Sequence, residues 1–312
     1  MSIGNKIKEY RELIKMTQKD IAGILEVEPG TISKYESGMI EPNIESLKRL
    51  ADTFNITVDE LIKDEKKLDI SDINILDVLR EQKEMQLKGN LYHNTQIIFA
   101  YNTNHIEGSK LTEDQTRYIY ETNTILFEKE TIASVDDILE TSNHFKLVDY
   151  MIDIAKEDLT EEMMKGFHKI LKEGTSDSSK DWFNIGDYKK LPNEVGGLKT
   201  TEPKYVERDM KKLMEWYNSL NQVTINEIIE FHVRFEKIHP FQDGNGRIGR
   251  IIMFKECLKH DVIPFIIFDK DKIFYYRGLY QYQVNKEKGV LIDTCLNAQD
   301  QYINIIERML KN

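Results

Sequence analysis

The chain has 312 residues, enough for about two domains and for a large buried core without disulfide or metal staples. Its formal charge of −11 argues against a non-specific nucleic-acid coat, and two cysteines outside any C-x-x-C pair argue against a disulfide framework or a cysteine zinc site. No secretory leader pattern is visible, and no apolar run approaches the roughly 20 residues of a membrane span. We therefore expect a cytoplasmic protein without membrane partners.

Residues 1–65 show the spacing and punctuation of five short helices. Thr17 with Asp20 forms a capping-box pattern at the start of the second helix, and Pro29 suits the first turn of the third. Apolar spacing places Ile24 on the buried face of the second helix. Short helices joined by tight turns are typical of a helix-turn-helix module.

The stretch from TQKDIAGILEVEPG to NITVDEL, residues 17–61, resembles the phage-repressor-type (XRE/Cro-like) helix-turn-helix family. The resemblance implies DNA contacts from Gln18, Thr31, Ser33 and Lys34. Residues 1–60 hold eight Lys or Arg and eleven Asp or Glu, a net charge of −3. A dimerisation or partner-docking module therefore stays open beside sequence-specific DNA binding.

The rest of the chain is expected to be mainly helical. Residues 66–90 form a linker helix region after a charged segment, and residues 91–312 form the second domain. Within it, residues 186–200 contain proline and paired glycines and predict a small β-hairpin. The fold class is thus mainly α, with a five-helix module followed by an α-helical domain that carries one hairpin.

One loop of the second domain has the features of an anion site. Pro240 ends a capped helix, and Gly244-Asn245-Gly246 leads directly into the next helix, which begins near Ile248. Free backbone N–H groups and the positive end of the helix dipole favour a phosphate there, and the glycines allow the backbone close to it.

Charged side chains around this loop suit a polyphosphate. Arg247 and Arg250 lie on neighbouring positions of the first helical turn and can clamp phosphates. Asp243 offers a hard oxygen ligand for Mg²⁺, and His239 has the pKa range of a general base at neutral pH. These parts predict a site for phosphoryl or nucleotidyl transfer.

The stretch HPFQDGNGRIGR also resembles the Fic/Doc family motif HPFx[D/E]GNGRxxR at every fixed position, and similarity extends over residues 90–300. The resemblance implies a protein adenylyltransferase that moves AMP from ATP to a Ser, Thr or Tyr hydroxyl of a target protein, with Mg²⁺ as cofactor. It implies that His239 is the base, that Asp243 holds the metal and that Phe241 anchors the loop in the core. It also assigns phosphate contacts to Gly244, Asn245, Gly246, Arg247 and Arg250.

The same resemblance suggests how other segments take part. The hairpin, near Lys190–Gly197, would hold the target by strand-like pairing, and Tyr275 or Tyr276 would line the adenine pocket. Thr103, Glu107 and Gly108 complete the pattern of the family's inhibitory helix, at about residues 96–108. Glu107 would pair with Arg250 and so hinder productive ATP binding.

Other interpretations of these residues remain open at this stage. Gly244, Gly246 and Gly249 with Asp269 match a dinucleotide-binding pattern, which needs a strand running into Gly244. A metal site could be built from His232, Glu236 and His239. His105 and His168 are expected to be structural.

Alternative functions also remain. The chain could be a transcriptional regulator whose second domain senses nucleotide, an enzyme that removes AMP, or a transferase of another nucleotide or of phosphocholine. The motif does not select the base, because ATP, UTP and GTP share the triphosphate that it would hold. The sequence is compatible with a homodimer.

Overall fold

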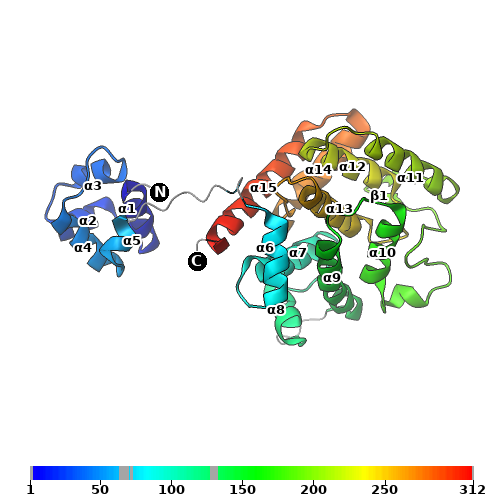
Figure 1. The fold of residues 1–312 in the computed structure, drawn as a ribbon, viewed down its shortest axis with the longest axis horizontal. Helices are drawn as coiled ribbons and strands as arrows, with labels where there is room; N and C mark the ends of the chain where they lie inside the picture. Colours follow the sequence, from blue (N-terminus) through cyan, green and yellow to red (C-terminus); the bar gives the residue numbers. More distant parts are fainter. Residues whose placement is uncertain (1–2, 63–69, 71–72, 127–132, 311–312) are drawn as a thin grey trace. The chain divides into compact units, whose positions relative to one another are not determined.

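The computed structural model describes residues 3–62, 70, 73–126 and 133–310. The chain divides into two compact units, residues 1–69 and residues 70–312. The boundary predicted between residues 65 and 66 lies outside the described residues. Each unit has a hydrophobic core of its own, and Figure 1 shows the helices of both units.

The described residues of the first unit form five helices. They are α1 (Ile3–Leu13), α2 (Gln18–Leu25), α3 (Pro29–Glu36), α4 (Ile44–Phe54) and α5 (Val58–Ile62). The predicted start of α2 is correct, because Thr17 and Asp20 form a reciprocal capping box. The prediction that Ile24 is buried is wrong, since its side chain is 37% exposed. At about 100° per residue, Ile24 falls outside the arc that Ile21, Ala22 and Leu25 bury.

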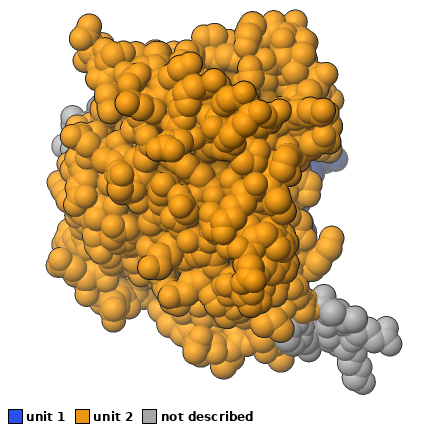
Figure 2. Space-filling model, turned by 90° about the vertical axis from the view of Figure 1, so that its right-hand side faces the viewer, with its two compact units in different colours: residues 1–69 blue, residues 70–312 orange. Residues whose placement is uncertain are grey.

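The second unit is almost entirely helical, which confirms the predicted fold class. Its helices are α6 (Ile75–Met85), α7 (Leu91–Ile106), α8 (Glu113–Thr122), α9 (Val135–Asp153), α10 (Glu161–Lys172), α11 (Pro203–Asn218), α12 (Ile225–Ile238), α13 (Asn245–Lys259), α14 (Lys272–Asn285) and α15 (Gly289–Leu310). Two short 3₁₀ turns, η2 (Ser176–Ser179) and η3 (Asp269–Asp271), lie between them. Figure 2 shows one face of this unit as closely packed atoms.

Nearly all residues of helix α13 are buried, so this helix lies in the middle of the unit. It packs against α12 and also contacts α7, α9 and α10. Hence the helix that begins at the glycine loop is surrounded by other helices, and side chains from several of them reach its N-terminus.

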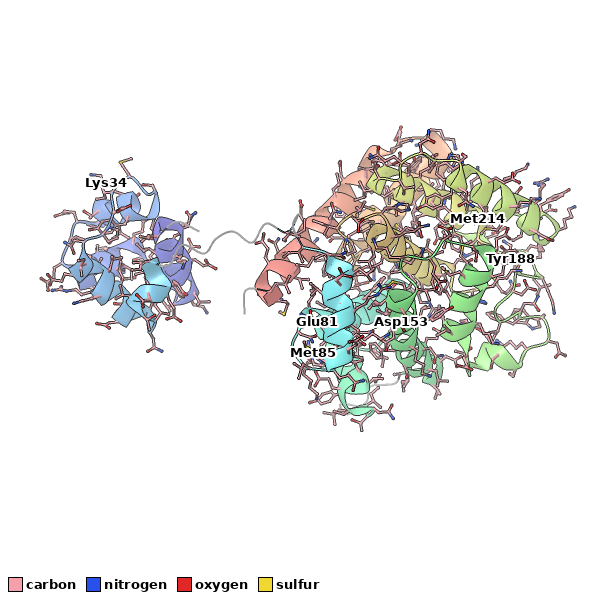
Figure 3. The ribbon with its side chains drawn as sticks, in the orientation of Figure 1. Lys34, Glu81, Met85, Asp153, Tyr188 and Met214 are labelled. Atoms are coloured by element: carbon pink, nitrogen blue, oxygen red, sulfur yellow. The ribbon has the colours of Figure 1, made fainter. Side chains whose placement is uncertain are left out.

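Helix α6 falls in the region predicted as a linker helix. Its Leu76 and Leu79 are buried in the main core of the second unit, where α6 packs on α7 and α9. Lys83 Nζ donates to Asp153 Oδ1 of α9 at 2.6 Å, and Figure 3 labels Asp153 on α9. Helix α6 is therefore an integral part of the second unit.

The predicted hairpin is present and very short. Strands β1 (Glu194–Val195) and β2 (Leu198–Lys199) pair antiparallel, with Glu194 opposite Lys199. Gly196 and Gly197 make the turn with φ of 56° and 77°, the left-handed values that a two-residue hairpin turn of type I′ requires. Residues 186–193 of the predicted flap form loop and turns instead of strand.

Among the described residues, no helix has both the length and the apolar character needed to cross a bilayer.

Candidate active site

The glycine loop between α12 and α13 is held in shape by one asparagine. Asn245 Oδ1 accepts from the backbone N–H of Phe241 at 2.8 Å, and its Nδ2 donates to the Phe241 carbonyl at 2.8 Å. The Asn245 side chain thus closes the loop on itself, so the backbone of this residue is the part left to meet an anion. Phe241 is fully buried and stacks on His168 at 4.2 Å, which agrees with its expected role as an anchor.

His239 stands where α12 ends. It adopts a left-handed backbone conformation, with φ of 51°, as the residue that caps the helix C-terminus. Its Nδ1 lies 3.4 Å from a Glu236 carboxylate oxygen, and its side chain is 14% exposed. Burial acts to raise the pKa of Glu236, but the interactions with His239 and the nearby His232 and Arg250 outweigh it, and the pKa is lowered. An ionised Glu236 can therefore orient the imidazole.

The N-terminus of α13 is the predicted anion site, and the Glu107 carboxylate lies against it at Gly246. The first amide groups of a helix have no intrahelical acceptor. The Glu107 carboxylate lies directly over Gly246 in this first turn, at a place that a β-carbon at position 246 would fill. The absence of a side chain at Gly246 therefore permits this close approach. Glu107 caps the C-terminus of α7, so that helix ends at Ile106, slightly before the predicted end.

Glu107 also binds the second arginine of the motif. Arg250 Nη2 donates to Glu107 Oε1 at 2.6 Å and to the Thr103 carbonyl at 3.0 Å, while Nε donates to Thr103 Oγ1 at 2.6 Å. Arg250 is 2% exposed. Although burial acts to lower its pKa, the charge of Glu107 outweighs that effect and raises it. Gly108 follows directly, with φ of 100°, and lets the chain turn away from the site.

The first arginine of the motif belongs to a buried network of charges. Arg247 donates to a Glu140 carboxylate oxygen and, at 3.2 Å, to Asp243 Oδ2. Lys172 Nζ bridges the same two acids, at 2.5 Å from Glu140 Oε1 and 2.7 Å from Asp243 Oδ2. Burial acts to raise the pKa of Asp243, but the charges of Arg247 and Lys172 hold it below its usual range.

Glu140 and Lys172 carried no signal in the sequence. They lie on α9 and α10, more than 65 residues before the motif, and each is an ordinary charged residue in its helix. Only the packing of α9 and α10 around α13 brings them to Arg247 and Asp243. Asn104, whose Oδ1 lies 3.5 Å from Arg247 Nη1, was inside the inhibitory pattern but was not singled out.

Two cavities meet these residues. The larger, of about 490 Å³, lies between the hairpin and α14. His239, Glu107 and Arg250 line one side of it, and Tyr275 and Tyr276 line another. The smaller, of about 210 Å³, is lined by polar groups including Asp243, Arg247, Glu140 and Glu107.

Asp243 is placed to supply an oxygen ligand to a metal ion. Its side chain is 52% exposed, and it borders the smaller cavity beside Arg247. Mg²⁺ is commonly held by one or two carboxylates together with substrate phosphates. As an exposed carboxylate that borders this polar cavity, Asp243 fits that donor set.

The structure does not support the dinucleotide-binding and metal-site interpretations of the motif. A helix, α12, runs into the glycine loop in place of the strand that a dinucleotide-binding pattern needs. His232 Nε2 is hydrogen-bonded to the Tyr275 hydroxyl at 2.6 Å. Within the described ranges, no three His, Cys, Asp or Glu side chains are grouped as metal ligands.

His168 and His105 have the partners of structural residues. The His168 Nδ1 accepts from the Gly186 N–H at 2.9 Å, and burial lowers the pKa of this imidazole to about 3. His105 Nδ1 lies 2.9 Å from Asp269 Oδ2. His105 is thus engaged outside the glycine loop, whereas His168 supports the loop by stacking on Phe241.

In the first unit, three predicted DNA-contacting residues lie on α3. Ser33 and Lys34 are exposed and Thr31 is partly exposed. Figure 3 shows Lys34 on α3 at the surface of this unit. Gln18, at the start of α2, is engaged differently, because its Nε2 donates to Glu36 Oε2 at 2.8 Å.

Comparison with known proteins agrees with both units. Residues 158–257 match the Fic/DOC family and residues 7–61 match a helix-turn-helix family. The chain is 25% identical over 194 residues to protein adenylyltransferase fic-1 of Caenorhabditis elegans, which covers 60% of this chain and 36% of that protein. It is 27% identical over 186 residues to protein adenylyltransferase Fic of Nematostella vectensis, covering 58% of this chain and 42% of that one. The chain thus spans less than half the length of these curated relatives.

A solved structure shows the same fold. The crystal structure of a Fic domain containing signaling protein from Bacteroides thetaiotaomicron matches with a TM-score of 0.62 and 22% identity, covering 77% of this chain and 97% of that one. The chain therefore carries a Fic/DOC family domain, preceded by a helix-turn-helix domain.

Proposed function

We propose that this chain is a protein adenylyltransferase that moves AMP from Mg-ATP to a Ser, Thr or Tyr hydroxyl of a target protein. The observation that carries the proposal is the position of His239. It lies beside the anion site at the N-terminus of α13 and lines a cavity that also holds Arg250 and the hairpin. Base, phosphate site and protein-binding edge are thus next to one another.

The reaction follows from these neighbours. His239 takes the proton of the target hydroxyl, and Glu236 at 3.4 Å orients the ring and stabilises its positive charge. The hydroxyl oxygen forms a bond to the α-phosphorus as the bond to the β-phosphate oxygen breaks, which leaves AMP on the target and releases pyrophosphate. Amide groups of the α13 N-terminus, Arg247 and Arg250 neutralise the phosphates. Mg²⁺ bound at Asp243 would add positive charge beside them.

Glu107 acts as a brake in this proposal. Its carboxylate lies over Gly246 and pairs with Arg250, where a phosphate of ATP would otherwise bind. A negative charge there repels the triphosphate, and a displacement of about 1 Å in the reacting group can cost two orders of magnitude in rate.

A labelling experiment tests the activity. The wild-type chain and Glu107→Gly are incubated with Mg²⁺, host lysate and ATP that carries the label on either its α- or its γ-phosphate. We expect protein bands labelled from the α-phosphate alone, stronger in Glu107→Gly and absent when His239→Ala is added to that variant. If ATP, UTP and GTP all fail to label protein, the nucleotide-sensing regulator becomes the better hypothesis. If wild-type chain strips label from a band, AMP removal is its main activity.

For the first unit we propose DNA binding through α3, which presents Ser33 and Lys34 to solvent. Arg11 and Gln18 both hydrogen-bond to the buried Glu36 and so brace α3 against its neighbours. A gel-shift assay over a salt series tests this proposal by comparing DNA duplexes of different sequence. Binding that shows no sequence preference would favour the dimerisation or partner-docking alternative.

A further inference from the structure

A buried lysine without an acidic partner lies at the base of the hairpin. Lys189 is 3% exposed, and none of the ion pairs formed among the described residues includes it. Its ammonium donates to Asn193 Oδ1 and Thr200 Oγ1, each at 2.7 Å, and to the Ile238 carbonyl at 3.3 Å. Lysine is rarely buried unless paired, but here three donors meet three neutral acceptors.

The three acceptors join two parts of the site. Asn193 directly precedes β1 and Thr200 directly follows β2, so these residues are the two ends of the hairpin. Ile238 is the residue before His239. The Lys189 backbone N–H also donates to the Pro240 carbonyl at 2.9 Å, just beyond His239. Lys189 therefore connects both hairpin ends to the backbone on either side of His239.

Asn193 adds a further link in the same place. Its Nδ2 donates to the Phe241 carbonyl at 3.1 Å, while Thr200 Oγ1 donates to the Asn193 carbonyl at 2.9 Å. The hairpin end and the loop after His239 thus share a continuous set of hydrogen bonds, and the Lys189 ammonium is at its centre.

The hairpin cannot hold its own position. Each strand has two residues, and Glu194, Val195 and Lys199 are exposed. An isolated two-stranded ribbon is at best marginally stable in water, and this one buries almost nothing. The placement of the hairpin must therefore come from its two ends, which Lys189 joins. Burial there lowers the pKa of Lys189 to about 8.

We propose that Lys189 is a positioning residue for the transfer reaction. Its ammonium fixes the hairpin edge relative to His239, so that a target segment paired with the edge presents its hydroxyl to the imidazole. The kinetic part of this inference rests on the proposed adenylyltransferase function. The anchoring part does not, because it concerns the hairpin in the free protein.

The anchoring part is tested by amide hydrogen exchange on the full chain carrying Glu107→Gly. In Lys189→Met, which keeps the side-chain length and removes the donors, we expect exchange at residues 194–199 to accelerate at least tenfold while α13 is unchanged. Thr200→Val removes one acceptor with little change in volume and should accelerate the same amides at least threefold. Lys211→Met, an exposed lysine on α11, is the matched control and should change nothing.

Exchange that is unchanged in residues 194–199 overturns the proposal. So does equal acceleration in the hairpin and α13, because that would show a general loss of stability. If Lys189→Met does not fold, Thr200→Val decides the matter on the same criterion.

The kinetic part uses labelling of lysate proteins by the same variants. We expect Lys189→Met to lose at least tenfold in transfer rate while its Kd for ATP, measured by calorimetry, stays within twofold. A loosened hairpin with an unchanged transfer rate overturns the positioning role. If the Glu107→Gly parent labels nothing, the proposed function fails, and the exchange result alone decides whether Lys189 anchors the hairpin.

Discussion

Removal of the Glu107 carboxylate should strengthen ATP binding and speed transfer. The carboxylate lies over the first turn of α13 and accepts a hydrogen bond from the buried Arg250. In Glu107→Ala both the negative charge and its volume over Gly246 disappear. Arg250 keeps two acceptors on Thr103, so it is not left without partners in the empty site.

The size of the effect can be bounded from this geometry. Two unit charges about 4 Å apart interact with about 4 kcal/mol at an effective dielectric constant near 20. The Glu107 side chain is 31% exposed, so solvent screens part of that repulsion. A hydrogen bond to a charged group contributes about 1.5–3 kcal/mol, which corresponds to about 10- to 150-fold in affinity. We therefore expect Glu107→Ala to tighten ATP binding by that factor.

A short series of variants separates charge from volume. Glu107→Gln keeps an acceptor for Arg250 and nearly the same bulk over Gly246, so we expect an effect between wild type and Glu107→Ala. Glu81→Ala removes an equal charge from the exposed surface of α6 and is the control (Figure 3). Calorimetry with Mg-ATP and initial labelling rates measure the two consequences. If both quantities in Glu107→Ala lie within twofold of wild type, the carboxylate is not a brake and the reasoning is wrong.

Further predictions concern the motif and the first unit. His239→Ala should lower the transfer rate by about 10²–10⁴-fold with the Kd for ATP within threefold, and retained transfer would exclude it as the base. Arg250→Ala should remain inactive in the Glu107→Gly background, since the phosphate clamp itself is lost; recovery of labelling would contradict that role. Asn245→Ala should lower the free energy of unfolding by about 2–4 kcal/mol in denaturant titrations, because two buried hydrogen bonds to the Phe241 backbone are lost; an unchanged midpoint would refute this. Lys34→Ala should reduce the slope of log affinity against log salt by about one in DNA titrations, and an unchanged slope would exclude a phosphate contact.

Local signals in the sequence were sufficient for the helices of the first unit. Thr17 with Asp20 and Pro29 mark helix starts, and the structure places a helix start at each of them. Capping depends on side chains within three residues, so it is visible without knowledge of the fold. The exposed Ile24 shows the limit of this reasoning, because hydrophobicity alone does not say which residues at the edge of an apolar face find a neighbour.

The glycine loop was also predictable, because its chemistry is contiguous. His239, Asp243, Gly246 and the two motif arginines lie within twelve residues, and a helix N-terminus makes an anion site by itself. The contact of Glu107 with Arg250 was implied only through a resemblance, since more than 140 residues separate the two. The glycine loop was predictable from neighbouring residues and the Glu107–Arg250 contact was not, because those two residues are far apart along the chain.

The mainly helical fold, the helix-turn-helix module, the hairpin and the residues of the glycine loop all follow from local sequence signals. Which charges surround that loop depends instead on how distant helices pack. Glu140 and Lys172 become partners of Arg247 and Asp243 because α9 and α10 pack on α13, and Lys189 becomes buried because the hairpin ends close over it. The residue type alone does not reveal whether a charged side chain lies at the surface or in the core. Its environment, and hence its chemistry, is set by helices that are distant in sequence and adjacent in space.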